Sequence, residues 1–158
     1  MTFDRRVLLM ALVIAASAAT SVAADHSGFN GSWKANLQKS DFGGQPAPDQ
    51  WIRTLTIQNG KITLASIQAR DGQELKSEFT LPTDGKQISM QMGGGDAKGT
   101  AVWEGDTLVI KTQRDSMNGE IVQNERATLA ADGKAITFDV AIQVGGNDLK
   151  MKMIFEKK

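Results

Sequence analysis

Side chains that could bind a metal or form a covalent intermediate are scarce in this sequence. It has one histidine, His26, and no cysteine. Zinc, copper and haem sites rely on His and Cys ligands, so we expect neither a metal nor another cofactor. His26 lies at the start of the region that we expect to fold, where a solvated side chain is the simplest interpretation. A Ser-His-Asp triad would require His26 to fold back onto the rest of the chain.

Carboxylates are the remaining candidates for acid–base chemistry. The closest pairs are Glu74 and Glu78, Glu104 and Asp106, and Glu120 and Glu125. We expect them on the solvated face of strands, because a catalytic pair needs one carboxyl group buried with a raised pKa. We therefore predict no catalytic residue.

The run Ile121 to Leu129 carries polar side chains on both of its alternating faces. One face places Gln123 and Glu125 on the same side as Ile121 and Leu129, and the other contains Arg126. Either orientation turns polar groups toward the interior, where they need hydrogen-bonding partners. Water or the head group of a ligand could supply these partners, so Gln123, Glu125 and Arg126 are candidate cavity-lining residues.

Methionines occupy alternate positions in two other runs. Met90 and Met92 follow Ile88, and Met151 and Met153 alternate with lysines that cannot be buried unpaired. We therefore predict that the Met side chains point inward. Since Met fills irregular space and is common at adaptable binding surfaces, we add Ile88, Met90, Met92, Met151 and Met153 to the candidate cavity lining.

Short strands must position these residues. Asn-Gly and Asp-Gly pairs punctuate the chain, and they favour tight hairpin turns because both residues tolerate positive φ. Between the turns, apolar residues alternate with polar ones, as in half-buried antiparallel strands. Nine or ten strands are predicted, at 31–36, 50–58, 61–69, 73–81, 87–92, 99–104, 107–113, 120–129, 135–144 and 148–156. The stretches 43–49 and Gly93 to Asp96 are the loosest, and the latter is a candidate mobile loop.

Short links between so many strands predict a meander, and closure removes its exposed edges. The fold class is therefore all-β: a single antiparallel up-and-down β-barrel of roughly 8–10 strands.

The N-terminus resembles an export signal. Arg5 and Arg6 precede an apolar run that ends in the small residues 21–24. We predict a signal peptide at 1–24, cleaved after Ala23 or Ala24, and a periplasmic or secreted domain at 25–158. Acidic and basic residues balance, which predicts no nucleic-acid partner. No later segment is apolar enough to form an integral membrane helix.

The stretch Gly31-Ser32-Trp33 resembles the Gly-x-Trp motif of the first strand of lipocalins and related calycins. With Asn36, Ser40 and Phe42 it is similar to the opening of a largely uncharacterised family of bacterial exported lipocalin-like proteins. The resemblance implies a barrel whose first strand carries Gly31 where backbones approach closely and Trp33 at the closed end. The chain departs from lipocalins proper because it has no Tyr for their Thr-Asp-Tyr motif, no predicted C-terminal helix and no disulfide.

We therefore expect an exported lipocalin-like protein that binds a small, largely apolar molecule inside its barrel. The first alternative is a non-enzymatic interaction module of the cell envelope, in which the barrel is a scaffold for the loops 43–49, 93–98 and 114–119. A less favoured alternative is a cofactor-free enzyme of calycin shape that uses a carboxylate. An empty apolar cavity favours the first hypothesis, a filled interior the second, and a buried carboxylate facing a pocket the third.

Overall fold

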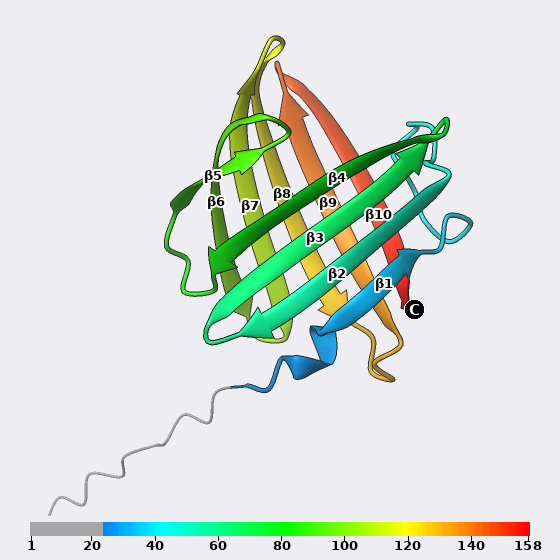
Figure 1. The fold of residues 1–158 in the computed structure, drawn as a ribbon, viewed down its shortest axis with the longest axis vertical. Coiled ribbons are helices and arrows are strands. Elements are labelled where there is room, and N and C mark those ends of the chain that lie inside the picture. Colours follow the sequence, from blue (N-terminus) through cyan, green and yellow to red (C-terminus); the bar gives the residue numbers. More distant parts are fainter. Residues whose placement is uncertain (1–23) are drawn as a thin grey trace, which may run out of the picture.

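The computed structural model describes residues 24–158, so the predicted signal peptide lies outside the described residues except for Ala24. A short 3-10 helix, η1 (Ser27–Phe29), precedes ten antiparallel strands in one sheet (Figure 1). The strands are β1 (Gly31–Ala35), β2 (Gln50–Gln58), β3 (Lys61–Arg70), β4 (Gln73–Pro82), β5 (Ile88–Met92), β6 (Gly95–Glu104), β7 (Thr107–Ser116), β8 (Gly119–Leu129), β9 (Ala135–Val144) and β10 (Asn147–Lys157). The predicted all-β, up-and-down architecture is confirmed.

Pairing of the first and last strands curves this sheet into a barrel. The strand order is β4-β3-β2-β1-β10-β9-β8-β7-β6-β5, and β1 pairs with β10 through Trp33↔Lys157 and Ala35↔Phe155. No ladder of hydrogen bonds joins β4 to β5 in the described sheet, so the barrel is nearly closed, with one seam between these two edge strands. No helix in the described part of the chain has the length and apolarity needed to cross a membrane.

The residues at the turns favour the tight hairpins that join β2 to β3 and β3 to β4. Asn59 and Asp71 have φ values of 52°, and the glycines that follow them have 69° and 75°. Positive φ at both central residues is the requirement of the tight turns that match the twist of paired strands. The Asn-Gly and Asp-Gly pairs therefore end β2 and β3 where the sequence predicts.

Two predicted loops are shorter than expected. The β5–β6 turn contains only Gly93 and Gly94, because β6 begins at Gly95 and not at residue 99. β7 continues to Ser116, which leaves Met117 and Asn118 as the β7–β8 turn. The prediction of a loop from Gly93 to Asp96 was wrong, because Gly95 and Asp96 pair with Met92 and Gln91.

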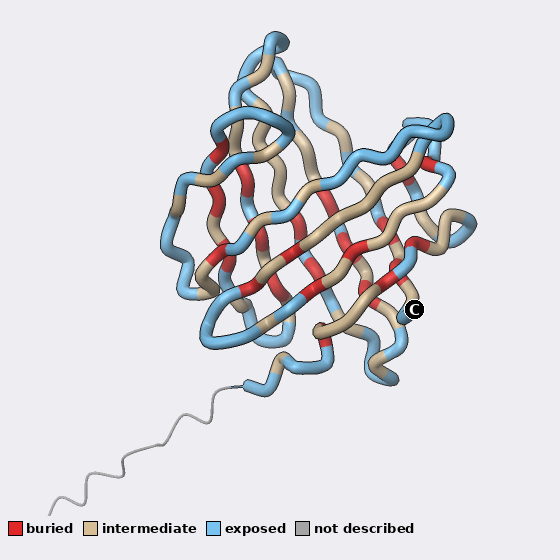
Figure 2. The backbone as a smooth tube through the Cα atoms, viewed as in Figure 1, coloured by how far each residue is buried: buried red, intermediate tan, exposed pale blue. Residues whose placement is uncertain are grey.

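The inward-facing side chains change character along the barrel. We call the half that contains η1 and the β2–β3, β6–β7 and β8–β9 turns the closed half, and the opposite half the open half. On β7, the inward Leu108 and Ile110 are buried in the closed half, whereas Arg114 in the open half is only half-buried. Figure 2 shows the buried residues gathered in the lower and middle parts of the barrel, with exposed strand ends at the top.

The Gly-x-Trp stretch belongs to the closed half. Trp33 is fully buried, and its Nε1 donates a hydrogen bond of 3.0 Å to the Phe29 carbonyl oxygen of η1. Gly31 has φ of 131°, a conformation that favours glycine. Its role is thus conformational, since a Cβ there would meet only the Lys157 side chain, at 3.6 Å.

His26 is not a freely solvated residue. Its ring stacks on Trp103 with a centroid distance of 3.5 Å and an interplanar angle of 1°, and Nε2 lies 3.3 Å from the Gly105 carbonyl oxygen. The prediction failed because the segment before η1 folds under the closed half, a tertiary contact with no local signal.

Candidate functional site

A cavity of about 260 Å³ occupies the open half of the barrel interior. Its apolar lining comes from Trp51, Leu64, Leu75, Phe79, Met92, Val140, Ile142, Met151 and Met153. Its polar lining comes from Arg53, Ser66, Gln68, Lys76, Ser77, Thr112, Arg114, Gln123 and Glu125. The volume lies just below the range for small-molecule sites, about 300–1,000 Å³.

An ion pair crosses the interior at the inner end of this cavity. Arg53 of β2 and Glu125 of β8 come from opposite walls, and their side chains are 5% and 8% exposed. The distance from Arg53 Nη1 to Glu125 Oε2 is 2.6 Å, and that from Nη2 to Oε1 is 3.4 Å. Gln123 Nε2 also donates a hydrogen bond to Glu125 Oε1. The two charges thus satisfy each other, as buried charges must.

Aromatic rings surround the Arg53 guanidinium. Its Cζ lies 4.5 Å from the centroid of Phe138, 4.9 Å from Trp51 and 5.4 Å from Phe155. Such contacts are favourable because the ring faces carry negative electrostatic potential. Trp51 is itself fixed by a hydrogen bond of 2.7 Å from its Nε1 to Ser66 Oγ. The polar inner end of the cavity is therefore rigidly organised.

Glu125 is a buried carboxylate that faces a pocket, the feature that would favour an enzyme. However, both of its oxygens accept hydrogen bonds from Arg53 or Gln123. An acid or base needs an oxygen within hydrogen-bonding reach of the substrate, and three of the roughly four acceptor positions of this carboxylate are already used, which leaves one on Oε2. Among residues 24–158, no group of three or more His, Asp or Glu side chains could hold a metal ion. The arrangement supports binding better than proton transfer.

The other predicted carboxylate pairs do not form sites. Glu74 pairs with Lys76 at 3.2 Å, and Glu104 pairs with Arg126 at 2.8 Å, both with exposed side chains. Glu120 and Glu125 are five residues apart on β8 and point to opposite faces of the sheet.

The structure separates the candidate lining residues into two groups. Met92, Gln123, Glu125, Met151 and Met153 all border the cavity. Three candidates do not: Ile88, Met90 and Arg126. Ile88 and Met90 pack against the apolar core. Arg126 points outward to Glu104, because Ala127 and Glu125 occupy the inward positions of β8.

Arg53, Trp51, Thr112 and Arg114 line the cavity but were not predicted to do so. A signal existed for the first two, since Trp51, Arg53 and Leu55 alternate on β2 and share one face. An inward arginine needs a partner, which the local sequence of β2 does not indicate. That partner, Glu125, is 72 residues away.

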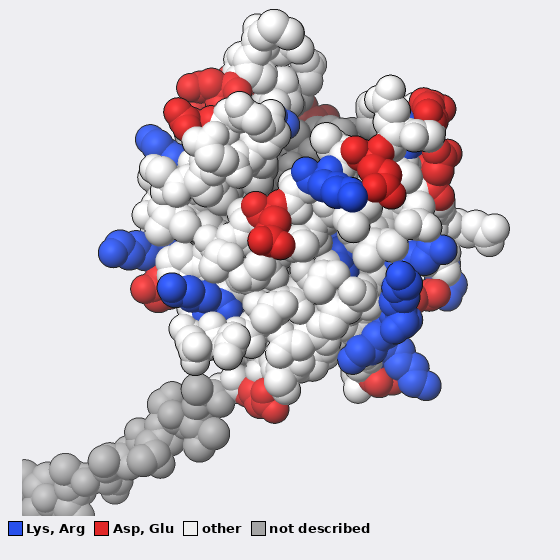
Figure 3. Space-filling view, viewed as in Figure 1, with Lys and Arg blue, Asp and Glu red and all other residues white. Residues whose placement is uncertain are grey.

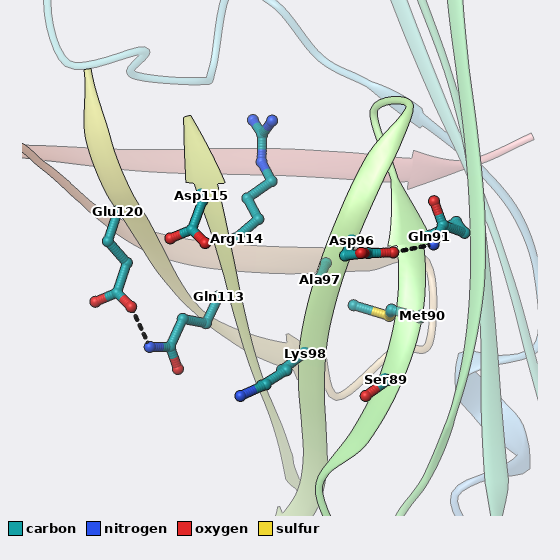
Figure 4. Close-up of a pocket in the computed structure, with 10 residues that line it drawn as sticks. All are labelled: Ser89, Met90, Gln91, Asp96, Ala97, Lys98, Gln113, Arg114, Asp115 and Glu120. Atoms are coloured by element: carbon teal, nitrogen blue, oxygen red, sulfur yellow. Dashed lines mark hydrogen bonds between the residues drawn. The ribbon is translucent and has the colours of Figure 1, made fainter. Parts of the chain in front are cut away.

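A second, larger hollow of about 570 Å³ lies on the outer face of β5 to β8. Figure 4 shows its lining, where Gln113 bonds to Glu120 and Gln91 bonds to Asp96. These polar groups satisfy one another and are exposed to solvent. On the face shown in Figure 3, positive and negative side chains are interspersed over most of the surface, and several Lys and Arg side chains gather at the lower right. The barrel interior is therefore the stronger candidate site.

No family model and no curated protein sequence matches this chain. Solved structures do match its fold. The zebrafish ileal bile acid-binding protein complexed with cholic acid superposes with a TM-score of 0.57 at 16% identity, covering 84% of this chain and 100% of that one. The Schistosoma mansoni fatty acid binding protein in complex with arachidonic acid gives 0.55 at 14% identity, covering 85% and 99%.

A third match has a different description. A secretory abundant heat soluble protein from Ramazzottius varieornatus gives a TM-score of 0.58 at 11% identity, covering 83% of this chain and 96% of that one. These likenesses identify the fold as a calycin-type β-barrel. At such low identity they carry no ligand and no binding residue to this chain.

Proposed function

We propose that this protein binds a small, largely apolar molecule in the open half of its barrel. The observation that carries the proposal is the cavity of about 260 Å³, whose walls combine apolar side chains with an internally paired Arg53 and Glu125. Apolar walls with a few convergent polar groups are typical of small-molecule sites. The matched structures with cholic acid and arachidonic acid support the proposal by analogy of fold.

A fluorescent apolar probe tests this function. We expect N-phenyl-naphthylamine to bind saturably, with enhanced emission. Met151→Trp should abolish the enhancement, because Met151 lines the cavity and the larger ring would fill it. The matched control is Met117→Trp, which places the same ring on the exposed β7–β8 turn and should bind the probe normally. Equal binding by both variants would contradict the proposal.

The scaffold hypothesis is the second candidate. It is favoured by the outer hollow of about 570 Å³, which is lined by residues of both 93–98 and 114–119. Retention of a partner from an envelope extract by wild-type protein, and its loss in Glu120→Lys, would support it. A chain that binds the probe and retains no partner favours the carrier.

Membership of the bacterial exported lipocalin-like family is part of the same proposal, as is export with removal of residues 1–24. The supporting observations are the residue pattern near the N-terminus and the Gly31-Ser32-Trp33 stretch. Mass spectrometry of protein from an envelope or secreted fraction should show an N-terminus at Ala24 or Asp25. Full-length protein confined to the cytoplasm would contradict export.

A further inference from the structure

The inner end of the cavity has already used most of its hydrogen-bonding capacity. Both terminal nitrogens of Arg53 bond to Glu125, whose Oε1 also accepts a hydrogen bond from Gln123. One polar atom is left over. Arg53 Nε is the single buried side-chain nitrogen or oxygen of residues 24–158 that has no hydrogen-bonding partner. An N–H that stays unpaired in the interior costs stability. Nε has less than 1 Å² of accessible surface in this structure, so an acceptor in the cavity can reach it only when the guanidinium turns toward the cavity.

The missing acceptor must be uncharged. A second anion at the inner end would lie close to Glu125 in a region of low effective dielectric, where like charges repel strongly. It could bind Arg53 through two bonds only by displacing Glu125, which would leave a buried carboxylate unpaired. A neutral ester, ketone or ether oxygen accepts a hydrogen bond from Nε–H without either penalty.

We propose that the ligand is an uncharged apolar molecule that places one oxygen acceptor on Arg53 Nε. This inference rests on the proposed function and names the class of its ligand. The surroundings fit that class, because rings of Trp51, Phe138 and Phe155 flank the guanidinium. Further out, Met92, Ile142 and Met151 border the path of an apolar chain.

Arg114 is the group that could favour an anion instead. It borders the same cavity on β7, and no carboxylate of residues 24–158 forms an ion pair with it. Figure 4 shows its guanidinium extended away from the carboxylates of Asp115 and Glu120. Arg114 is partly exposed, and it lies nearer the open end than Thr112. An anion could therefore contact it only at the mouth.

Two matched ligands distinguish these possibilities on the wild-type protein. Methyl decanoate and decanoate share the same chain and carbonyl, and only decanoate is charged at neutral pH. Displacement of N-phenyl-naphthylamine should show the ester binding at least about tenfold more tightly, because both ligands can accept the hydrogen bond but only decanoate is repelled by Glu125. Equal affinities, or a preference for decanoate, would overturn the inference.

Variants of Arg53 and Glu125 test whether the preference for the ester depends on this ion pair. In Glu125→Gln the repulsion is removed, so the preference for the ester should fall by about tenfold or reverse. If that variant does not fold, Arg53→Met combined with Glu125→Leu replaces the pair with apolar side chains of similar size. In this variant the affinity for the ester, measured relative to that for the probe, should fall about tenfold. Unchanged ester affinity would mean that water, and not ligand, satisfies Nε, and would overturn the inference.

A separate experiment tests whether Arg114, at the open end of the cavity, binds an anion. Decanoate binding that is strong in the wild type and lost in Arg114→Gln, but retained in the outward-facing control Arg126→Gln, would place an anion at the mouth and overturn the inference. If no ligand and no probe binds saturably, the proposed function itself fails. Saturable probe binding without an ester preference overturns the ligand class alone.

Discussion

The two halves of the barrel are built on the same strands but obey different packing rules. On β3 the inward Ile62 and Leu64 of the closed half are buried, whereas Ser66 and Gln68 of the open half are only partly buried and line the cavity. The closed half is occupied by buried apolar side chains, as an ordinary core is. The open half keeps space and polar groups. One continuous β-sheet can thus provide a stable base and a binding site without a second domain.

The boundary between the halves lies at the Arg53–Glu125 pair. Across β2, β3 and β4, Arg53, Ser66 and Ser77 stand side by side in register. Leu55, Leu64 and Phe79 begin the apolar side of that boundary. On these three strands the inward side chains therefore become polar at one level, whereas β9 and β10 keep the apolar Val140, Ile142 and Met151 along the cavity.

The largest expected effect tests the closed half. Trp33→Ala should lower the free energy of unfolding by about 3–5 kcal/mol, because it opens a cavity at a fully buried site. Denaturant unfolding measures this loss. Trp51→Ala in the open half is the matched control and should cost clearly less, since Trp51 is half-buried beside existing space. Equal losses would mean that the halves do not differ in packing.

At the boundary between the halves, replacing Glu125 alone should destabilise the protein, whereas replacing Arg53 and Glu125 together should cost little stability. Glu125→Leu alone leaves the Arg53 charge buried without a partner and should cost about 3–5 kcal/mol. Adding Arg53→Met should recover most of that loss, because apolar groups of similar volume replace a buried ion pair at little cost. Thermal and denaturant melts of the single and double variants would show it. A double variant no more stable than Glu125→Leu would contradict this account.

Small-to-large substitutions test whether the open half of the barrel contains more free space than the closed half. Ala101→Leu adds volume at a fully buried position and should destabilise the protein by about 1–3 kcal/mol, as overpacking does. Ser77→Leu adds similar bulk beside the cavity and should change stability little while weakening probe binding. The reverse result, with Ser77→Leu the more destabilising, would show that the open half is filled.

The smallest effect concerns the connection between β1 and β2. Asn36 and Lys39 of this connection donate hydrogen bonds to Glu156 of β10. Hydrogen bonds from Lys39 and then from Asn36 lower the pKa of Glu156 below its ordinary value of 4.5. A lowered pKa in the folded state stabilises the protein above the unfolded pKa, and this contribution is lost as pH falls through the folded pKa.

An NMR titration of Glu156 measures this effect. Lys39→Met should raise the pKa of Glu156 toward 4.5 and reduce the loss of stability on acidification. The exposed control Lys86→Met should leave that pKa where it is. If the pKa of Glu156 were the same in the wild type and in Lys39→Met, the proposed contribution of the Lys39 hydrogen bond would be contradicted.

Some of the candidate site could be predicted from local patterns. Alternation on β8 narrowed its inward side chains to two sets, and the set with Gln123 and Glu125 proved to face the cavity. Alternation on β10 identified Met151 and Met153 as inward residues. Alternation does not indicate how far along the barrel axis an inward side chain lies. Met90 alternates as Met92 does, yet it packs against the core and not the cavity, because depth depends on how strands stagger around the barrel.

The sequence by itself determined the ten strands, their antiparallel order along the chain and most of their turns, although the β5–β6 and β7–β8 turns are shorter than it predicts. Each of these depends on neighbouring residues: a period of two along a strand, and positive φ at Asn-Gly and Asp-Gly pairs. Only the tertiary structure decided which polar side chains are matched. Arg53 and Glu125 carry no mark of each other in the sequence, since a charge can be buried only where another segment of the chain supplies its partner. Closure of the sheet brings β2 opposite β8, and the cavity and its ion pair arise from that closure.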